Sequence, residues 1–111
     1  MIKAIFYTTS NDKHIDQFQI EGHADYAEYG KDIVCAAVSA LTITIINSMI
    51  QILDVKIDYK ENDGIIICKL PLVQDIVLDA KLQLLVQTLI MGLREISKEY
   101  KDSIKIKTIT K

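Results

Sequence analysis

Hydrophobic and polar positions alternate along several short segments of the chain. Residues 14–21 place Phe18 and Ile20 on one face and Gln17 and Gln19 on the other, which is the two-residue period of a half-buried strand. Similar alternation, or a short apolar run rich in β-branched residues, marks four further segments. These predicted strands are Ile2–Thr8, 55–60, 65–70 and 104–109.

The longest uncharged segment predicts a buried helix. No charged residue occurs in residues 33–53, a length that would also be enough to span a membrane. A polar stripe at helical spacing argues against a membrane span, which would not usually carry one. The stripe consists of Thr44, Asn47, Ser48 and Gln51. We therefore expect a helix of a soluble protein, begun by Asp32 as N-cap, and no membrane partner.

A second helical segment covers residues 73–100, where apolar side chains recur with the period of a helix. Gly92 lies inside it at a cost of about 1 kcal/mol relative to alanine, which predicts close packing at this position. Residues 62–64, Asn-Asp-Gly, predict a hairpin turn between the third and fourth strands. The resulting order is ββαββαβ. We expect an α+β fold with one mostly antiparallel sheet and two long helices.

Composition and charge narrow the class of protein. A chain of 111 residues, 50% of them hydrophobic, fits one domain over residues 1–111. The net charge is −2 and no basic face is apparent, so we expect no direct nucleic-acid partner. Two cysteines are too few for a disulfide framework, and the first residues lack the pattern of a signal peptide. These features predict a cytoplasmic protein with reduced thiols.

A histidine and a cysteine flank the loop predicted at residues 24–31. His23 follows the second strand, and Cys35 falls in the first turn of the first helix if Asp32 is the N-cap. The helix dipole and the unpaired N–H groups at a helix start favour a thiolate and could bind an oxyanion. Such a position beside an imidazolium lowers the pKa of a cysteine to roughly 3.5–7.5. The pair has the form of an activated nucleophile and its base, although the spacing alone also fits a core cysteine and a surface histidine.

Two interpretations are open for each of three other residues near this pair. Asp32 either orients His23 as a third catalytic residue or only caps the helix, and an acidic cap would oppose thiolate formation. Tyr26 and Tyr29 either contact a substrate from the loop or pack over the domain. Cys68, in an apolar strand, is expected to be an inert buried thiol.

The residues around this pair resemble a known family. The matching segments are 22–24 (GHA), 26–27 (YA), 30–41 (GKDIVCAAVSAL) and 91–96 (MGLREI). They are similar to the ribosomal processing cysteine protease family, Prp, whose length and element order also fit this chain. The resemblance therefore covers nearly all of the sequence.

The resemblance implies a bacterial enzyme that removes the N-terminal extension of large-subunit ribosomal protein twenty-seven. In that family the cut falls after two phenylalanines and before alanine, the enzyme is a homodimer, and no cofactor is needed. Matched residue by residue, Cys35 takes the position of the nucleophile and His23 that of the base.

The resemblance also assigns secondary positions. Asp32 and Ser39 match supporting positions of the site, and Gly22 and Gly30 match hinges of the loop between them. Asp25 departs from the pattern, because many relatives have glycine there.

Three alternatives remain at this point. A non-catalytic, ribosome-associated binding module would have Cys35 merely packed in the core. A thiol redox sensor would need Cys68 as its resolving partner, and the apolar strand around Cys68 argues against that. A metal site would draw on His14, His23 and the two cysteines, none of which shows the spacing of zinc ligands, so no metal is expected.

Overall fold

The computed structural model describes residues 1–9, 13–22 and 32–111. The elements are β1 (Ile2–Thr8), β2 (Ile15–Glu21), α1 (Ile33–Asn47), η1 (Ser48–Ile52), β3 (Asp58–Asn62), β4 (Ile65–Lys69), α2 (Ile76–Glu99) and β5 (Ile104–Thr110). The η1 segment is a π-helical turn that continues α1. This order confirms the predicted ββαββαβ arrangement.

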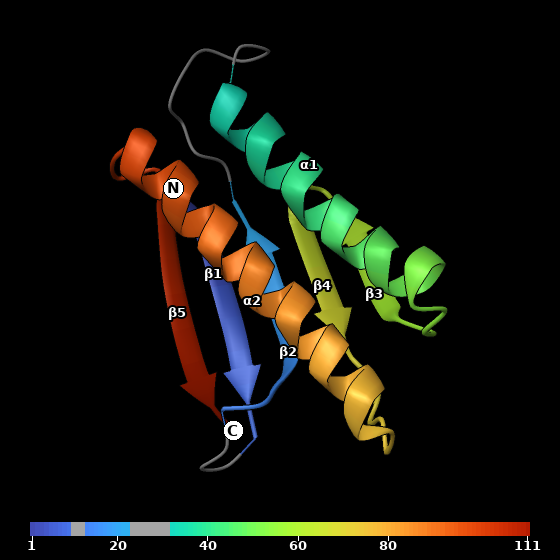
Figure 1. The fold of residues 1–111 in the computed structure, drawn as a ribbon. Coiled ribbons are helices and arrows are strands. Elements are labelled where there is room, and N and C mark those ends of the chain that lie inside the picture. The colour runs from blue at the N-terminus through green and yellow to red at the C-terminus, as the bar shows by residue number, and fades with distance from the viewer. Residues whose placement is uncertain (10–12, 23–31) are drawn as a thin grey trace.

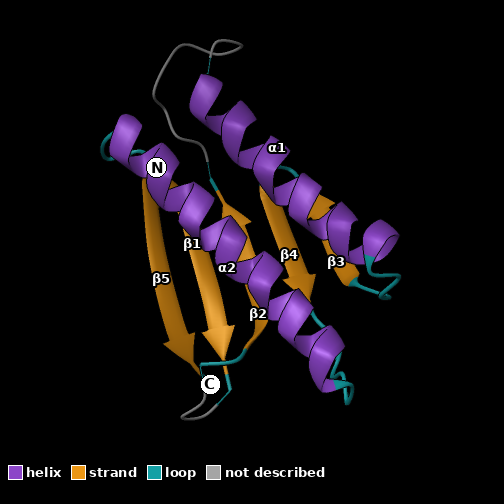
Figure 2. Cartoon of the chain, in the orientation of Figure 1, coloured by secondary structure: helices purple, strands orange, loops and turns teal. Residues whose placement is uncertain are grey.

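The five strands form one sheet in the order β3-β4-β2-β1-β5. β1 and β5 are parallel, and the three other neighbouring pairs are antiparallel. Both helices lie on the same face of this sheet (Figures 1 and 2). The predicted α+β class, with a mostly antiparallel sheet and two long helices, is therefore confirmed.

The third strand lies further along the chain than residues 55–60, where the alternating pattern predicted it. Asp63 and Gly64 have φ angles of +46° and +84°, as a tight two-residue hairpin turn requires. This turn pairs Asn62 with Ile65 and therefore Asp58 with Lys69. Pro71 follows soon after Lys69 and has no N–H for a longer ladder, so β3 cannot begin much earlier.

The second helix begins later than predicted, at Ile76 instead of residue 73. Asp75 caps it, because its carboxylate accepts hydrogen bonds from the N–H groups of Val77 and Leu78 at 3.0 and 3.1 Å. The apolar periodicity upstream of Asp75 belongs to the connection from β4. Capping by a side chain outweighed that periodicity at this end.

The hydrophobic core lies between the helices and the covered face of the sheet. Phe6 and Phe18 face each other across β1 and β2, with ring centroids 5.7 Å apart. Both side chains are fully buried, together with Ile46, Met49, Leu82, Val86, Leu89 and Leu93 from the helical layer. Each such side chain contributes about 1.5–3 kcal/mol relative to its exposed state.

Polar contacts also join α2 to the start of β2. The Gln83 side chain accepts from the Ile15 N–H at 2.9 Å and donates to the Ile15 carbonyl at 2.7 Å. His14 Nε2 lies 2.8 Å from Asp79 Oδ1. The two Gln83 contacts satisfy the N–H and the carbonyl of Ile15, at the end of the β1–β2 ladder. Together with the His14–Asp79 pair, they hold α2 at that end of the sheet.

By length and apolar composition, two helical segments could cross a membrane, namely Ile33–Ile52 and α2. The core helix of a soluble protein meets the same criterion. Both segments pack on the sheet and supply a large part of the core.

The two helices pack closely where Gly92 meets Leu41. A Cβ atom on Gly92 would lie 2.5 Å from Leu41 Cδ2, closer than real carbon contacts allow. The predicted close packing at Gly92 is therefore confirmed. Glycine at this position lets α1 and α2 lie side by side.

We expect Gly92→Val to lower the free energy of unfolding by about 1–3 kcal/mol, because the added methyl groups collide with Leu41. In a double-mutant cycle measured by urea denaturation, Leu41→Ala should relieve part of that loss, with a coupling of at least about 0.5 kcal/mol. Gln87→Val, on the exposed side of α2, is the control for helix propensity. An equal loss in Gly92→Val and Gln87→Val would contradict the close contact.

Candidate active site

Asp32 caps the N-terminus of α1. Its backbone is extended (φ −78°, ψ 91°), and its Oδ1 accepts a hydrogen bond from the Cys35 N–H at 3.0 Å. The Ala36 N–H donates to the Asp32 carbonyl at 3.3 Å, which closes the first turn. The predicted N-cap is therefore confirmed, and Cys35 is the third residue of the helix.

The second oxygen of the same carboxylate contacts the thiol. Cys35 Sγ donates to Asp32 Oδ2 at 3.2 Å, so a single residue receives both the backbone and the side-chain hydrogen of Cys35. A carboxylate at this distance favours the protonated thiol over the thiolate. Because the cap takes the Cys35 N–H, that group is not free to bind an oxyanion in this arrangement.

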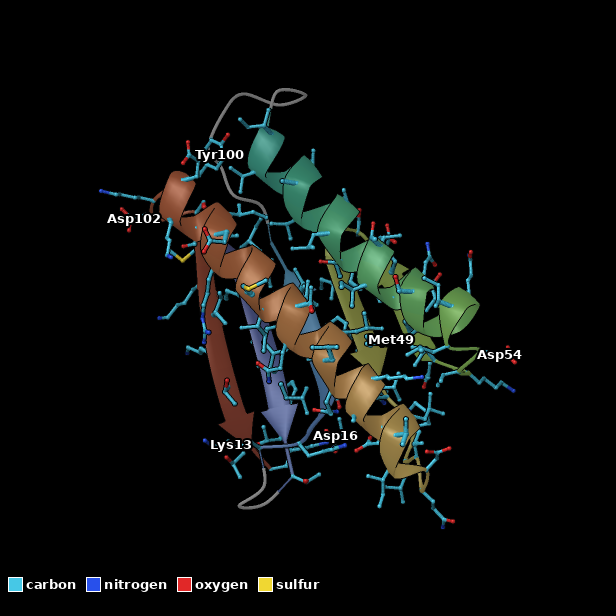
Figure 3. The ribbon with its side chains drawn as sticks, in the orientation of Figure 1. Lys13, Asp16, Met49, Asp54, Tyr100 and Asp102 are labelled. Carbon is cyan, nitrogen blue, oxygen red and sulfur yellow. The ribbon has the colours of Figure 1, made fainter. Side chains whose placement is uncertain are left out.

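Cys35 opens onto a cavity of about 140 Å³. Its lining comes from the end of the sheet where β2 ends, β4 begins and α1 starts, and these three elements can be followed in Figure 1. Most of its lining is apolar, with a few polar groups, as is usual for small binding sites. The lining residues are Ile2, Ile20, Gly22, Cys35, Val38, Ser39, Glu61, Gly64, Ile65 and Ile66. In Figure 3, Tyr100 and Asp102 mark this end of the sheet, and Lys13 and Asp16 mark the opposite end.

Gly22 lies on one side of the cavity, at a position where the backbone requires glycine. Its φ angle is +94°, and a Cβ atom there would lie 2.7 Å from the Met1 carbonyl oxygen. Its N–H donates to the Gly64 carbonyl at 3.1 Å. The end of β2 is thus held against both the start of β1 and the β3–β4 turn.

The structure brings together four of the residues singled out in the sequence. Cys35 and Ser39 stand one helical turn apart on the same wall, Asp32 binds Cys35, and Gly22 lies on the adjoining wall. His23, Tyr26, Tyr29 and Gly30 lie outside the described residues.

Sequence reasoning missed the contribution of the β3–β4 hairpin to this cavity. The Asn-Asp-Gly signal located the turn, but nothing local to it indicated that the hairpin would stand beside Cys35. Glu61 and Gly64 enter the cavity because β4 pairs with β2 and carries the turn to the end of the sheet. That pairing joins segments far apart in the chain.

Cys68 lies elsewhere and is fully buried, as predicted. Burial raises the pKa of its thiol to about 12, and the nearby charge of Asp58 adds to the effect. Cys35 and Cys68 are both reduced thiols. Within residues 1–9, 13–22 and 32–111, no three His, Cys, Asp or Glu side chains are grouped so that they could hold a metal ion.

The chain matches proteins of known class over almost all of its length. A model of the family described as cysteine protease Prp matches residues 1–105. The ribosomal processing cysteine protease Prp of Bacillus subtilis (strain 168) is 35% identical over 101 residues, which cover 89% of this chain and 90% of the relative. The protein of the same name from Staphylococcus aureus (strain Mu50) is 31% identical over 102 residues, covering 89% and 92%.

Solved structures agree with this assignment. The S. aureus protease Prp with a covalently linked product peptide superposes with a TM-score of 0.84 at 27% identity, covering 97% of this chain and 99% of that one. The same enzyme with a substrate peptide gives a TM-score of 0.79 at 26% identity and the same coverage. Family model, sequence identity and fold together show that this chain is a cysteine protease and belongs to the ribosomal processing cysteine protease Prp family.

Proposed function

We propose that Cys35 is the nucleophile and His23 the general base of a peptidase that removes the N-terminal extension of bacterial ribosomal protein twenty-seven. The observation that carries the proposal is the cavity at the start of α1. Cys35 stands on its wall in the first turn of the helix, and Gly22, the residue before His23 in the sequence, lines the same cavity. The covalent peptide complex of the S. aureus relative supports a nucleophilic mechanism in the family.

In this mechanism His23 removes the thiol proton, and Cys35 Sγ attacks the carbonyl carbon of the scissile bond. The protonated His23 then transfers its proton to the departing amine as the C–N bond breaks, which leaves a thioester on Cys35. His23 next takes a proton from water, and the resulting attack releases the acid product and the free thiol. The proton removed in the first step is the one that the thiol shares with Asp32 in the structure.

The remaining residues have supporting roles in this proposal. Asp32 holds Cys35 at the helix start, and Ser39 presents a hydroxyl to the same cavity. The apolar walls accept the phenylalanines before the cut, and Tyr26 and Tyr29 contact the peptide from a loop hinged at Gly22 and Gly30. The reaction uses no cofactor.

We also propose that residues 1–111 form one protease domain that acts as a homodimer in the cytoplasm, without direct nucleic-acid contact. The helical layer supports the dimer. Within one chain, 33% of the most apolar 18-residue stretch of Ile33–Ile52 is buried, and 28% of the corresponding stretch of α2. The large apolar side chains left exposed on these segments include Ile33, Ile52, Ile76, Val77, Leu84 and Met91. Apolar side chains left exposed along both helices are consistent with an interface that covers them.

Removing either proposed catalytic group should abolish cleavage. Incubated with ribosomal protein twenty-seven carrying its extension, Cys35→Ala and His23→Ala should each cut at least about 10³-fold more slowly than wild type, because the first lacks the nucleophile and the second lacks the base that removes its proton. Mass spectrometry of the products measures the rate and locates the cut. Cys68→Ala is the matched control and should retain cleavage. Activity that survives Cys35→Ala would end the proposal.

The two thiols should differ sharply in reactivity. At pH 7, iodoacetamide should modify Cys35 at least about tenfold faster than Cys68, because the raised pKa of Cys68 keeps it protonated and burial shields it. Raising the pH to 9 should leave Cys68 slow, since that pH is still well below its pKa of about 12. Peptide mass spectrometry assigns the label, and unfolding in guanidinium should equalise the two sites. Faster labelling of Cys68 in the folded protein would contradict this account.

Asp32 variants separate capping from catalysis. Asp32→Asn keeps an oxygen for the Cys35 N–H and removes the charge that opposes the thiolate. It should therefore label with iodoacetamide at least as fast as wild type and keep cleavage within about tenfold. Asp32→Ala should lose about 1 kcal/mol of stability in urea denaturation through loss of the cap. A loss of cleavage near 10⁴-fold in Asp32→Asn, the size seen when the acid of a triad is replaced, would instead make Asp32 a third catalytic residue.

A further inference from the structure

Glu61 faces the Cys35 cavity from the edge of the sheet. The register pairs Glu61 with Ile66 and Ile66 with Ile20, and both isoleucines are buried under the helices. Since residues directly opposite each other share a face, Glu61 is on the covered side of the sheet, the side that carries α1. It therefore stands on the same cavity as Cys35 and Ser39.

Glu61 is the acidic member of an otherwise neutral lining. The other described residues around the cavity are apolar side chains, two glycines, Ser39 and Cys35. Glu61 itself is exposed, and its carboxylate has no hydrogen-bond or ion-pair partner within residues 1–9, 13–22 and 32–111. A solvated edge charge that prevents strand pairing would explain its presence on β3, but not its position on the side of the nucleophile.

The other charged residues at this end of the sheet lie on its uncovered face. A second cavity of about 370 Å³ shares Gly22, Gly64 and Ile65 with the first and adds Met1, Lys3, Glu21 and Asp63. The register pairs Lys3 with Glu21 and Glu21 with Ile65, and these residues alternate with the buried Ile2, Ile20 and Ile66. On the side that carries Cys35, the charge that a group entering the cavity would meet from the described lining is that of Glu61.

We propose that Glu61 is a specificity-determining residue that binds a lysine or arginine side chain of the substrate peptide close to the scissile bond. This proposal rests on the proposed protease function. Because Glu61 is exposed, the ion pair is of the surface kind, and the preference it gives should be only several-fold. The alkyl part of a lysine or arginine packs on the apolar lining around Ile66, on the same face of the sheet, while its charged end reaches the carboxylate.

A positional scan of peptides tests this assignment. Synthetic peptides with Phe-Phe before the bond and Ala after it carry a single lysine, or its uncharged analogue norleucine, at each remaining position in turn. The measurement is the ratio of kcat/KM for the lysine peptide to that for the norleucine peptide. In wild type this ratio should reach about 3–10 at one position, fall to about 1 in Glu61→Gln, and drop below 1 in Glu61→Lys.

Asp58→Asn is the matched control. It removes the same charge from the same strand, but from the opposite face, because Asp58 pairs with the exposed Lys69. Its ratio should equal that of wild type. In wild type, the preference should also weaken as salt is raised from 0.05 to 0.5 M, about as expected for a partly exposed ion pair.

Binding to Cys35→Ala separates this proposal from the protease mechanism. The same peptides, labelled with fluorescein, are titrated into Cys35→Ala and into Cys35→Ala/Glu61→Gln, and anisotropy gives Kd. A lysine preference that depends on Glu61, without cleavage by wild type, would keep this proposal and overturn the proposed peptidase. Cleavage with the same ratios in wild type and Glu61→Gln at every position would overturn the role of Glu61. If no peptide is bound or cut, both fail.

Discussion

Phe6 and Phe18 meet on neighbouring strands beneath two helices, and the geometry of the rest follows from covering that one face of the sheet. A sheet with a single apolar face needs a helical layer of matching width, and here α1 and α2 must lie close together to provide it. The glycine at position 92 makes that approach possible. With α1 fixed over β4, its first turn comes to the end of the sheet where the cavity forms, so the placement of Cys35 is a result of core packing.

Local signals in the sequence were enough for much of this architecture. The alternation in β2 predicted which side chains face the core, and an aspartate in front of an apolar run predicted where α1 starts. These local signals failed where residues far away in the sequence determine where a strand begins. The start of β3 depends on the register that its turn imposes and on Pro71, which follows the end of the partner strand, and neither affects the alternation of residues 55–60.

The candidate site divides in the same way. Cys35 was found because the chemistry of a helix start is local, and the resemblance to a protease family supplied its pairing with His23. Glu61 was not found, because its entry into the cavity requires the β2–β4 pairing. The structure also gives a distance to the opposing charge that the sequence indicated at Cys35. The helix dipole favours a thiolate, whereas the capping carboxylate of Asp32 lies 3.2 Å from the sulfur and opposes it. The cap thus favours a protonated thiol at Cys35, from which the proposed base would have to remove the proton.

The parallel pairing of β1 with β5 joins the first strand of the sheet to the last. Ile2 is paired with Ile104 and donates its N–H to the Ser103 carbonyl, and the same Ile2 lines the cavity. During synthesis on the ribosome, the early segments leave the exit tunnel well before residues 104–110 are available. The wall beside Cys35 therefore cannot be completed on a nascent chain until residues 104–110 have also left the tunnel, so the helix that carries the proposed nucleophile is synthesised long before the cavity beside it can close.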